Sequence, residues 1–150
     1  QVKMGATTIW EHWDGIKPDG SMWSPDMNSF NHYAYGAIGE WIQRTMVGIE
    51  VDDLNPGYSH YYIQPLVDSR FSFVNGSLMT QFGEIKSSWV FDEGQVTLSI
   101  SVPVNTSCTV LLKQAEKVIN SDLEQGFIKN DHGFMSCVGS GDYKITYLVK

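Results

Sequence analysis

The residues best suited to chemistry stand near the start of the chain, where Glu11 lies between Trp10 and His12 and is followed by Trp13. Neighbouring indole rings limit the hydration of a carboxylate, which strengthens it as a base. Such a group suits general acid–base catalysis, for example glycoside hydrolysis, in which two carboxylates flank the scissile bond. The alternative is a surface glutamate beside buried tryptophans, and the local sequence leaves both interpretations open.

Aromatic residues are concentrated around this glutamate. Seven of them fall within the first 50 residues: Trp10, Trp13, Trp23, Phe30, Tyr33, Tyr35 and Trp41. Trp and Tyr rings stack on the apolar faces of sugars, while carboxylates, amides and imidazoles bind the hydroxyls. Composition alone still favours an ordinary aromatic core. His32 has the same two interpretations, because it either hydrogen-bonds a sugar hydroxyl or stacks between Tyr33 and Tyr35.

The charge balance excludes several classes of partner. With 17 acidic against 10 basic residues the net charge is −7, and no cluster of positive charge suits nucleic acid or an anionic membrane. No apolar run approaches the roughly 20 residues that span a bilayer. The histidines lack metal-ligand spacing, and phosphate-binding and dinucleotide-binding motifs are missing. We therefore expect no nucleic-acid or membrane partner, no metal and no cofactor.

One long helix must position the first part of the chain. Apolar residues recur at helical spacing and predict a helix from Phe30 to Val47 that ends at Gly48. Asn28, Ser29 and Asn31 are its candidate N-caps. The segment before it is rich in Gly, Pro, Asp and Ser, so a loop is expected there. The aspartates in that loop are expected to form caps or Asx turns: Asp14, Asp19 and Asp26.

After Val51 the apolar pattern changes to alternation, which is typical of half-buried strands. Asn75-Gly76 is predicted to be a two-residue hairpin turn, and Pro103 is predicted to end a strand. We expect a mainly β fold, in which a loop and one long α-helix precede an antiparallel β-sandwich. Strands are expected over residues 58–64, 71–74, 77–82, 85–91, 96–102, 106–112, 117–119 and 143–149, with 127–138 ambiguous.

The beginning of the chain predicts a piece of a larger protein. The first residue is Gln1, no signal peptide is expected in this stretch, and the amphipathic helix has no obvious partner. That helix either packs on the sandwich or belongs with elements that precede this chain. Cys108 and Cys137 lie among apolar residues and are expected to be buried free thiols. The cellular compartment stays open.

Several blocks resemble the bacterial α-L-rhamnosidases of glycoside hydrolase family 78. Residues 5–14, Gly-Ala-Thr-Thr-Ile-Trp-Glu-His-Trp-Asp, resemble a signature near the end of the catalytic domain. Residues 27–37, Met-Asn-Ser-Phe-Asn-His-Tyr-Ala-Tyr-Gly-Ala, resemble the next block at the expected separation. Shorter matches follow at 56–58, 63–65 and 103–106, so the resemblance spans nearly the whole chain in order.

The resemblance implies a large enzyme in which an (α/α)₆ catalytic barrel precedes a C-terminal β-sandwich. Residues 1–49 would then end the barrel, and residues 50–150 would form the sandwich. Members of the family remove terminal α-L-rhamnosyl groups with inversion. By motif, Glu11 matches the general base and His32 matches a residue that contacts rhamnose. The chemistry of Trp10 and Trp13 suggests that they shape the pocket.

The implied partners are a rhamnose-containing glycoside and the rest of the barrel. The general acid of the family lies outside this chain, so the chain alone is expected to be inactive. The alternative is a non-catalytic sandwich that binds carbohydrate or only supports the barrel. Its candidate aromatic platform comprises Tyr61, Tyr62, Trp89 and Phe91, most of which the alternation places in the core.

Overall fold

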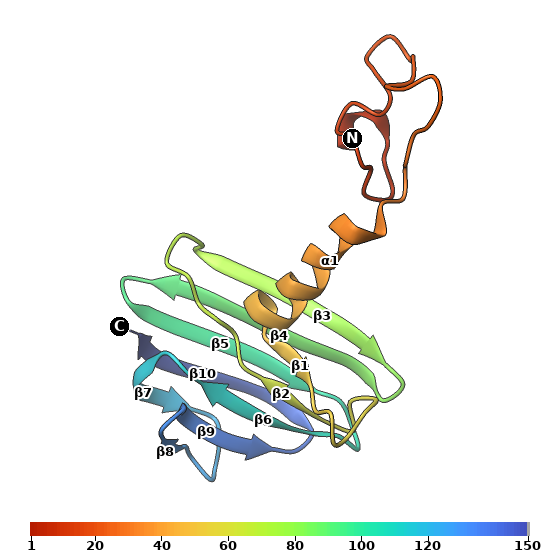
Figure 1. Cartoon of the computed structure of the whole chain (residues 1–150). Helices are drawn as coiled ribbons and strands as arrows, with labels where there is room; N and C mark the ends of the chain where they lie inside the picture. The colour runs from red at the N-terminus through yellow and green to blue at the C-terminus, as the bar shows by residue number, and fades with distance from the viewer. Residues whose placement is uncertain (150) are drawn as a thin grey trace. The chain divides into compact units, whose positions relative to one another are not determined.

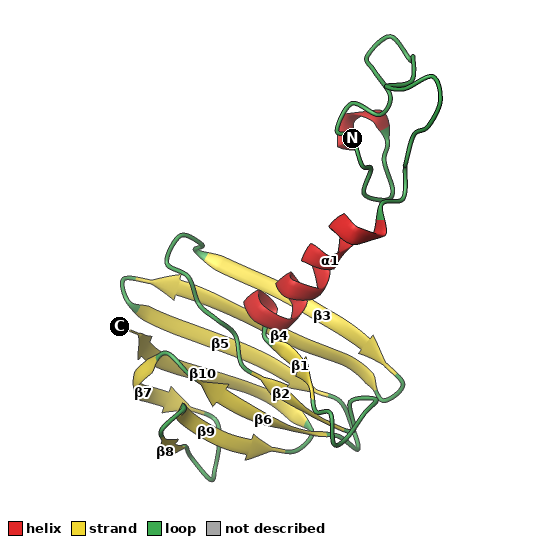
Figure 2. Cartoon of the chain, in the orientation of Figure 1, coloured by secondary structure: helices red, strands yellow, loops and turns green. Residues whose placement is uncertain are grey.

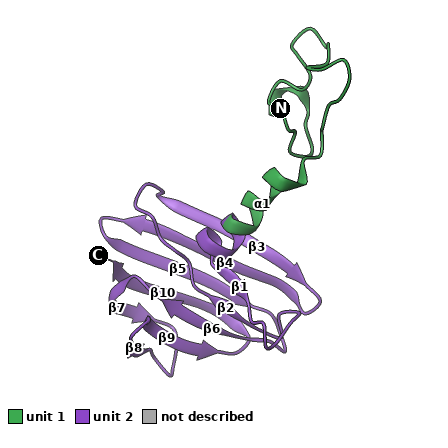
Figure 3. Ribbon diagram, viewed as in Figure 1, with its two compact units in different colours: residues 1–41 green, residues 42–150 purple. Residues whose placement is uncertain are grey.

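The computed structural model describes residues 1–149, which form two compact units (Figure 3). The first unit, Gln1–Trp41, contains a short 3₁₀ helix, η1 (Val2–Met4), a long irregular segment and helix α1 (Tyr33–Trp41). The second unit begins at Ile42 with a π-helix, η2 (Ile42–Val47), and contains all the strands. No helix among residues 1–149 is both long and apolar enough to cross a membrane.

The helical segment agrees with the predicted one at its end but not at its start. Helical residues run without interruption from Tyr33 to Val47, changing from α to π at Ile42. The predicted end at Gly48 is confirmed, because this glycine adopts a left-handed φ of 84°. Every residue of α1 is exposed. Its apolar side chains therefore have no covering layer among the described residues.

Among the described residues, ten strands form the two sheets of a β-sandwich (Figures 1 and 2). One sheet has the order β1-β2-β6-β9-β8 and the other β3-β4-β5-β10-β7. The predicted mainly β fold is confirmed, with one parallel pair, β2 and β6, among antiparallel neighbours. The strands are β1 (Ile49–Val51), β2 (His60–Ile63), β3 (Phe73–Thr80), β4 (Gly83–Asp92), β5 (Gln95–Val102), β6 (Ser107–Leu112), β7 (Ala115–Ser121), β8 (Ile128–Asn130), β9 (Gly133–Val138) and β10 (Gly141–Val149).

The predicted hairpin turn at Asn75-Gly76 is wrong. Both residues lie inside β3, which pairs with β4 without a break, and the turn falls at residues 81–82. Gly76 is required there for a different reason. A Cβ on Gly76 would come within 2.4 Å of the Val47 side chain. Glycine at this position therefore lets Val47, at the end of the helical segment, pack closely against β3.

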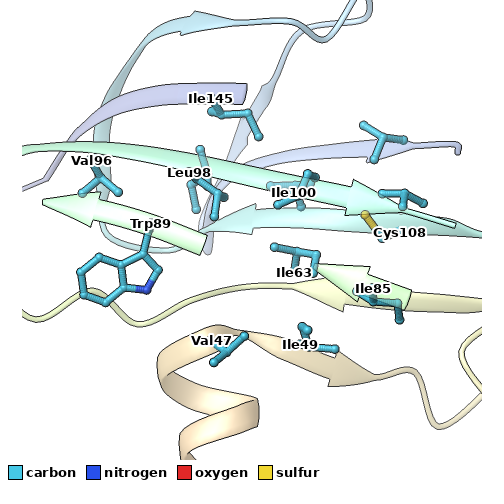
Figure 4. Packing of buried hydrophobic residues seen from close by; sticks show 14 of the residues in the cluster. Val47, Ile49, Ile63, Ile85, Trp89, Val96, Leu98, Ile100, Cys108 and Ile145 are labelled. Atoms are coloured by element: carbon cyan, nitrogen blue, oxygen red, sulfur yellow. The ribbon is translucent and has the colours of Figure 1, made fainter. Parts of the chain in front are cut away.

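One hydrophobic core lies between the sheets (Figure 4). Inward-facing residues alternate along β5 as the sequence predicts, and the largest buried side chains are Trp89, Tyr61 and Tyr147. Cys108 is buried as expected, whereas the expectation for Cys137 is wrong, because this residue is exposed. Cys137 is opposite Thr109 in the ladder, one position away from Cys108, and successive strand residues face opposite sides of the sheet.

The parallel pair is joined by a side chain as well as by the backbone. The His60 ring on β2 contacts two hydroxyls on β6, with Nδ1 at 2.7 Å from Ser107 Oγ and Nε2 at 3.1 Å from Thr109 Oγ1. His60 is therefore engaged on both nitrogens within the sandwich. This structural role accounts for a histidine that the sequence leaves without a function.

Candidate functional site

Two segments of the first unit lie side by side and carry the two candidate polar residues. The Glu11 N–H donates to the Ser29 carbonyl at 2.9 Å, and the His32 N–H donates to the Ile9 carbonyl at 2.7 Å. These backbone bonds bring together two residues that are far apart in the chain. The structure therefore places Glu11 and His32 on adjacent segments, although these contacts involve their backbones rather than their side chains.

Trp10 forms the small core beneath these segments. Its side chain is 5% exposed, and its ring meets Phe30 edge to face at a centroid distance of 5.0 Å. Gly15 permits this packing, since a Cβ there would lie 3.0 Å from the Phe30 ring and 3.3 Å from the Trp10 ring. Trp10 thus supports the turn that carries Glu11, which matches the core interpretation of this tryptophan.

The Glu11 side chain is partly buried. None of the hydrogen bonds or ion pairs formed among residues 1–149 engages its carboxylate. A general base needs a carboxylate that can accept a proton from water, and one already paired with a cation is weaker in that role. The Glu11 carboxylate meets this requirement.

His32 serves as the N-cap of α1. Its Nδ1 accepts a hydrogen bond from the Tyr35 N–H at 3.4 Å, and its ring stacks on the Tyr35 ring at 4.2 Å. The helix therefore begins at Tyr33, and none of the three predicted caps occupies this position. An Nδ1 that accepts a hydrogen bond leaves the proton of the neutral imidazole on Nε2. His32 can then donate through Nε2 to a ligand.

The other aromatic residues of the first unit divide into exposed and stacked rings. Trp13 is 86% exposed, and so it is not packed against Trp10. His12 stacks on Trp23 with centroids 3.6 Å apart, a pairing that no sequence spacing indicates. Phe30, which closes over Trp10, is likewise a contact that sequence reasoning missed. Both are contacts across the long loop, for which periodicity gives no signal.

The loop aspartates include one that behaves as predicted. Asp19 accepts hydrogen bonds from the Ser21 N–H at 2.9 Å and the Ser21 hydroxyl at 2.6 Å. Both hydrogen bonds lower the pKa of Asp19, and the one from the Ser21 hydroxyl has the larger effect. The geometry is an Asx turn and uses the carboxylate locally. Within residues 1–149 no group of three His, Cys, Asp or Glu side chains is arranged to hold a metal.

The sandwich does not present the candidate aromatic platform. Tyr61 and Trp89 are buried in the core, while Tyr62 and Phe91 are half-buried. A platform for a sugar needs rings that lie open to solvent side by side. These four residues therefore give no support to carbohydrate binding by the sandwich.

Comparison with known protein families matches most of the chain, in two consecutive parts. Residues 1–46 match the bacterial alpha-L-rhamnosidase 6 hairpin glycosidase domain, and residues 48–126 match the bacterial alpha-L-rhamnosidase C-terminal domain. The two matches follow one another along the chain, the hairpin glycosidase domain first. The chain belongs to the bacterial α-L-rhamnosidase family.

Individual relatives agree with this assignment. An α-L-rhamnosidase of Streptomyces avermitilis is 33% identical over 97% of this chain, and one of Formosa agariphila is 35% identical over 87%. The crystal structure of the Streptomyces avermitilis α-L-rhamnosidase complexed with L-rhamnose superposes with a TM-score of 0.76, covering 97% of this chain. The native enzyme from Aspergillus terreus, 30% identical, superposes over 100% of this chain with a TM-score of 0.71.

The chain spans only a small part of these relatives. It covers 14% of the Streptomyces avermitilis protein, 15% of the Formosa agariphila protein and 16% of the Aspergillus terreus chain. It corresponds to the C-terminal region of such enzymes, where a hairpin domain meets the C-terminal domain.

Proposed function

We propose that this chain is the C-terminal portion of an inverting α-L-rhamnosidase and supplies its general base, Glu11. The observation that carries the proposal is a partly buried Glu11 carboxylate without a partner, in a segment paired with that of His32. The match of residues 1–46 to a glycosidase domain supports it. Residues 1–49 are assigned to the catalytic domain and residues 50–150 to the C-terminal domain.

Inversion needs two carboxyl groups on opposite sides of the sugar, roughly 6.5–9.5 Å apart, so that a water fits between one of them and the anomeric carbon. In this mechanism the Glu11 carboxylate removes a proton from that water as its oxygen bonds to the anomeric carbon. The bond to the leaving-group oxygen breaks at the same time, and an acid elsewhere in the full-length enzyme protonates that oxygen. The product is the β-anomer of rhamnose.

The other candidate residues of the first unit bind the sugar or shape its pocket. His32 donates a hydrogen bond from its Nε2–H group to a rhamnose hydroxyl, because its Nδ1 accepts one from the Tyr35 N–H. The exposed indole of Trp13 offers a face for the apolar side of the sugar. Trp10 packs against Phe30 and so keeps the turn that carries Glu11 in place. The substrates are glycosides that end in rhamnose.

The chain alone is inactive under this proposal. Its first unit carries one of the two required carboxyl groups, and the remainder of the catalytic domain supplies the other together with most of the pocket. Loss of leaving-group protonation typically costs 10²–10⁴-fold, and loss of the pocket adds the cost of positioning.

The deciding experiment compares the full-length enzyme with its Glu11→Gln variant on an aryl α-L-rhamnoside. We expect kcat to fall by about 10³-fold or more with substrate binding retained, because glutamine cannot accept the proton. Proton NMR of the wild-type reaction should show β-rhamnose first. Near-normal turnover by the variant would remove Glu11 from the mechanism. Release of α-rhamnose as the first product would instead refute inversion.

A further inference from the structure

The last carbonyls of the helical segment are capped by residues of the strands and loops of the sandwich. An α-helix leaves its last carbonyls without intrahelical partners. Here the carbonyls of four successive residues each accept a hydrogen bond from the second unit. They are Thr45 from the Leu66 N–H (2.8 Å), Met46 from Trp89 Nε1 (2.8 Å), Val47 from Ser87 Oγ (2.7 Å) and Gly48 from the Gln64 N–H (2.8 Å).

Side-chain packing and an ion pair also hold the six residues of η2 in place. Val47 is buried, and it packs where Gly76 leaves no side chain; Figure 4 shows it beside the core residue Ile49. Arg44 pairs with Glu50, with its Nε at 2.9 Å from Oε2. The turn is thus held by hydrogen bonds, by packing and by an ion pair, all within the second unit.

Two of the donors have no alternative use. Ser87 and Trp89 are 0% and 1% exposed, and both lie on β4 facing the core. The only hydrogen bonds that residues 1–149 provide for the Ser87 hydroxyl and the Trp89 indole N–H are those to η2. A buried polar group left unpaired is costly. The core of the sandwich is therefore built to receive a helix end.

We propose that Gly76, Ser87 and Trp89 are positioning residues of the enzyme, here called the helix clamp. The clamp holds the end of a helical segment that begins directly after His32 and runs without interruption to Val47. Under the proposed function, the sandwich thereby holds the end of the last helical segment of the catalytic domain, residues 42–48. This inference rests on the proposed function for its effect on activity, but not for the capping itself.

The test uses the full-length enzyme with two variants: Ser87→Ala removes one donor with little change of shape, and Trp89→Phe removes the other while keeping an aromatic ring in the core. Ile145→Val is the matched control, because it loosens the same core on β10 and removes no hydrogen-bond donor. Amide hydrogen exchange by mass spectrometry reports on residues 42–48, and kinetics on an aryl α-L-rhamnoside report on the site. All variants are measured under conditions in which circular dichroism shows that they are folded.

We expect exchange at residues 42–48 to become about tenfold faster in both clamp variants and to change little in Ile145→Val. We expect kcat/KM to fall about tenfold in the clamp variants only, because small misplacements of binding groups are costly. Unchanged exchange would overturn the capping role. Faster exchange with the kinetics of the control would overturn the positioning role. A wild-type enzyme inactive on rhamnosides would refute the proposed function, and exchange would then decide the clamp alone.

Discussion

Under the proposed function His32 combines two tasks in one ring, and each nitrogen serves one of them. Nδ1 accepts the Tyr35 N–H and begins α1, while Nε2 is left to donate to a ligand. The cap and the proposed sugar contact therefore reinforce each other, because the cap fixes both the tautomer and the ring orientation. Such an arrangement resembles the way second partners orient histidine ligands in metal sites.

Two substitutions separate these tasks. In the full-length enzyme we expect His32→Asn to keep a cap acceptor and to lose the Nε2 donor, so KM should rise about tenfold with little loss of stability. His32→Ala should raise KM similarly and also destabilise the protein by about 1 kcal/mol, since the cap is lost. Steady-state kinetics and thermal unfolding measure the two effects. A normal KM in both variants would contradict the sugar contact.

The two cysteines should differ sharply in reactivity. Desolvation of Cys108 and, secondarily, the nearby Cys137 raise the pKa of the Cys108 thiol from 9.0 to about 12. At pH 8 iodoacetamide should therefore label Cys137 in the folded chain and leave Cys108 unlabelled until denaturant is added. Peptide mass spectrometry identifies the labelled site. Equal labelling of both thiols in the folded chain would contradict the burial of Cys108.

The same raised pKa sets the sign of a stability change. Between pH 9 and about 12 the unfolded thiol ionises first, so the unfolded state binds fewer protons than the folded one. The contribution of Cys108 to stability is therefore complete below pH 9 and is lost as the pH rises towards about 12.

At the scale of elements, the contact of Val47 with β3 makes Gly76 a sensitive position. A methyl group at Gly76 would lie within 2.4 Å of Val47, so the helix end or the strand would have to move. We expect Gly76→Ala to destabilise the chain by about 1–3 kcal/mol in urea unfolding. Gly139→Ala is the control, because a Cβ there meets nothing within 4 Å. Equal effects of the two substitutions would show that the helix end is not seated at Gly76.

Sequence alone predicted the elements that local pattern controls. Alternation along residues 96–102 and the glycine at position 48 gave a strand and a helix end that the structure confirms. The prediction of a turn at Asn75-Gly76 was wrong, because Gly76 is needed for its close contact with Val47, which lies 29 positions earlier in the chain. A rule that considers only neighbouring residues cannot predict such a contact. The helix start moved from Phe30 to Tyr33 for the same kind of reason, since the backbone before it is paired with the segment of Glu11.

The candidate site was predictable only in part. Local chemistry made Glu11 and His32 candidates, and a family resemblance implied their roles. The pairing of their segments by backbone hydrogen bonds could not be inferred from spacing. The Trp10–Phe30 contact and the His12–Trp23 stack join opposite sides of an irregular loop. Loops lack a periodicity that tells inward from outward positions, so composition could indicate aromatic contacts but not their partners.

At the scale of the molecule, the isolated chain and the full-length enzyme should behave differently. We expect the 150-residue chain to show no rhamnosidase activity above background, whereas the full-length protein is active. A fluorogenic α-L-rhamnoside measures both at equal concentration. The Glu11→Gln chain is the control for contaminating enzyme. Turnover by the chain that disappears in this variant would contradict the need for a second carboxyl group from outside it.

The parallel pair of β2 and β6 has a consequence for how the sandwich assembles. These strands are joined along their length and by His60, yet the whole of β3, β4 and β5 lies between them in the chain. Bringing them together closes a long loop, whose entropy cost must be met before the contact stabilises anything. The antiparallel meander of β3, β4 and β5 needs only tight turns. We therefore expect the local meander to form first and the long-range closure of β2 on β6 to follow it.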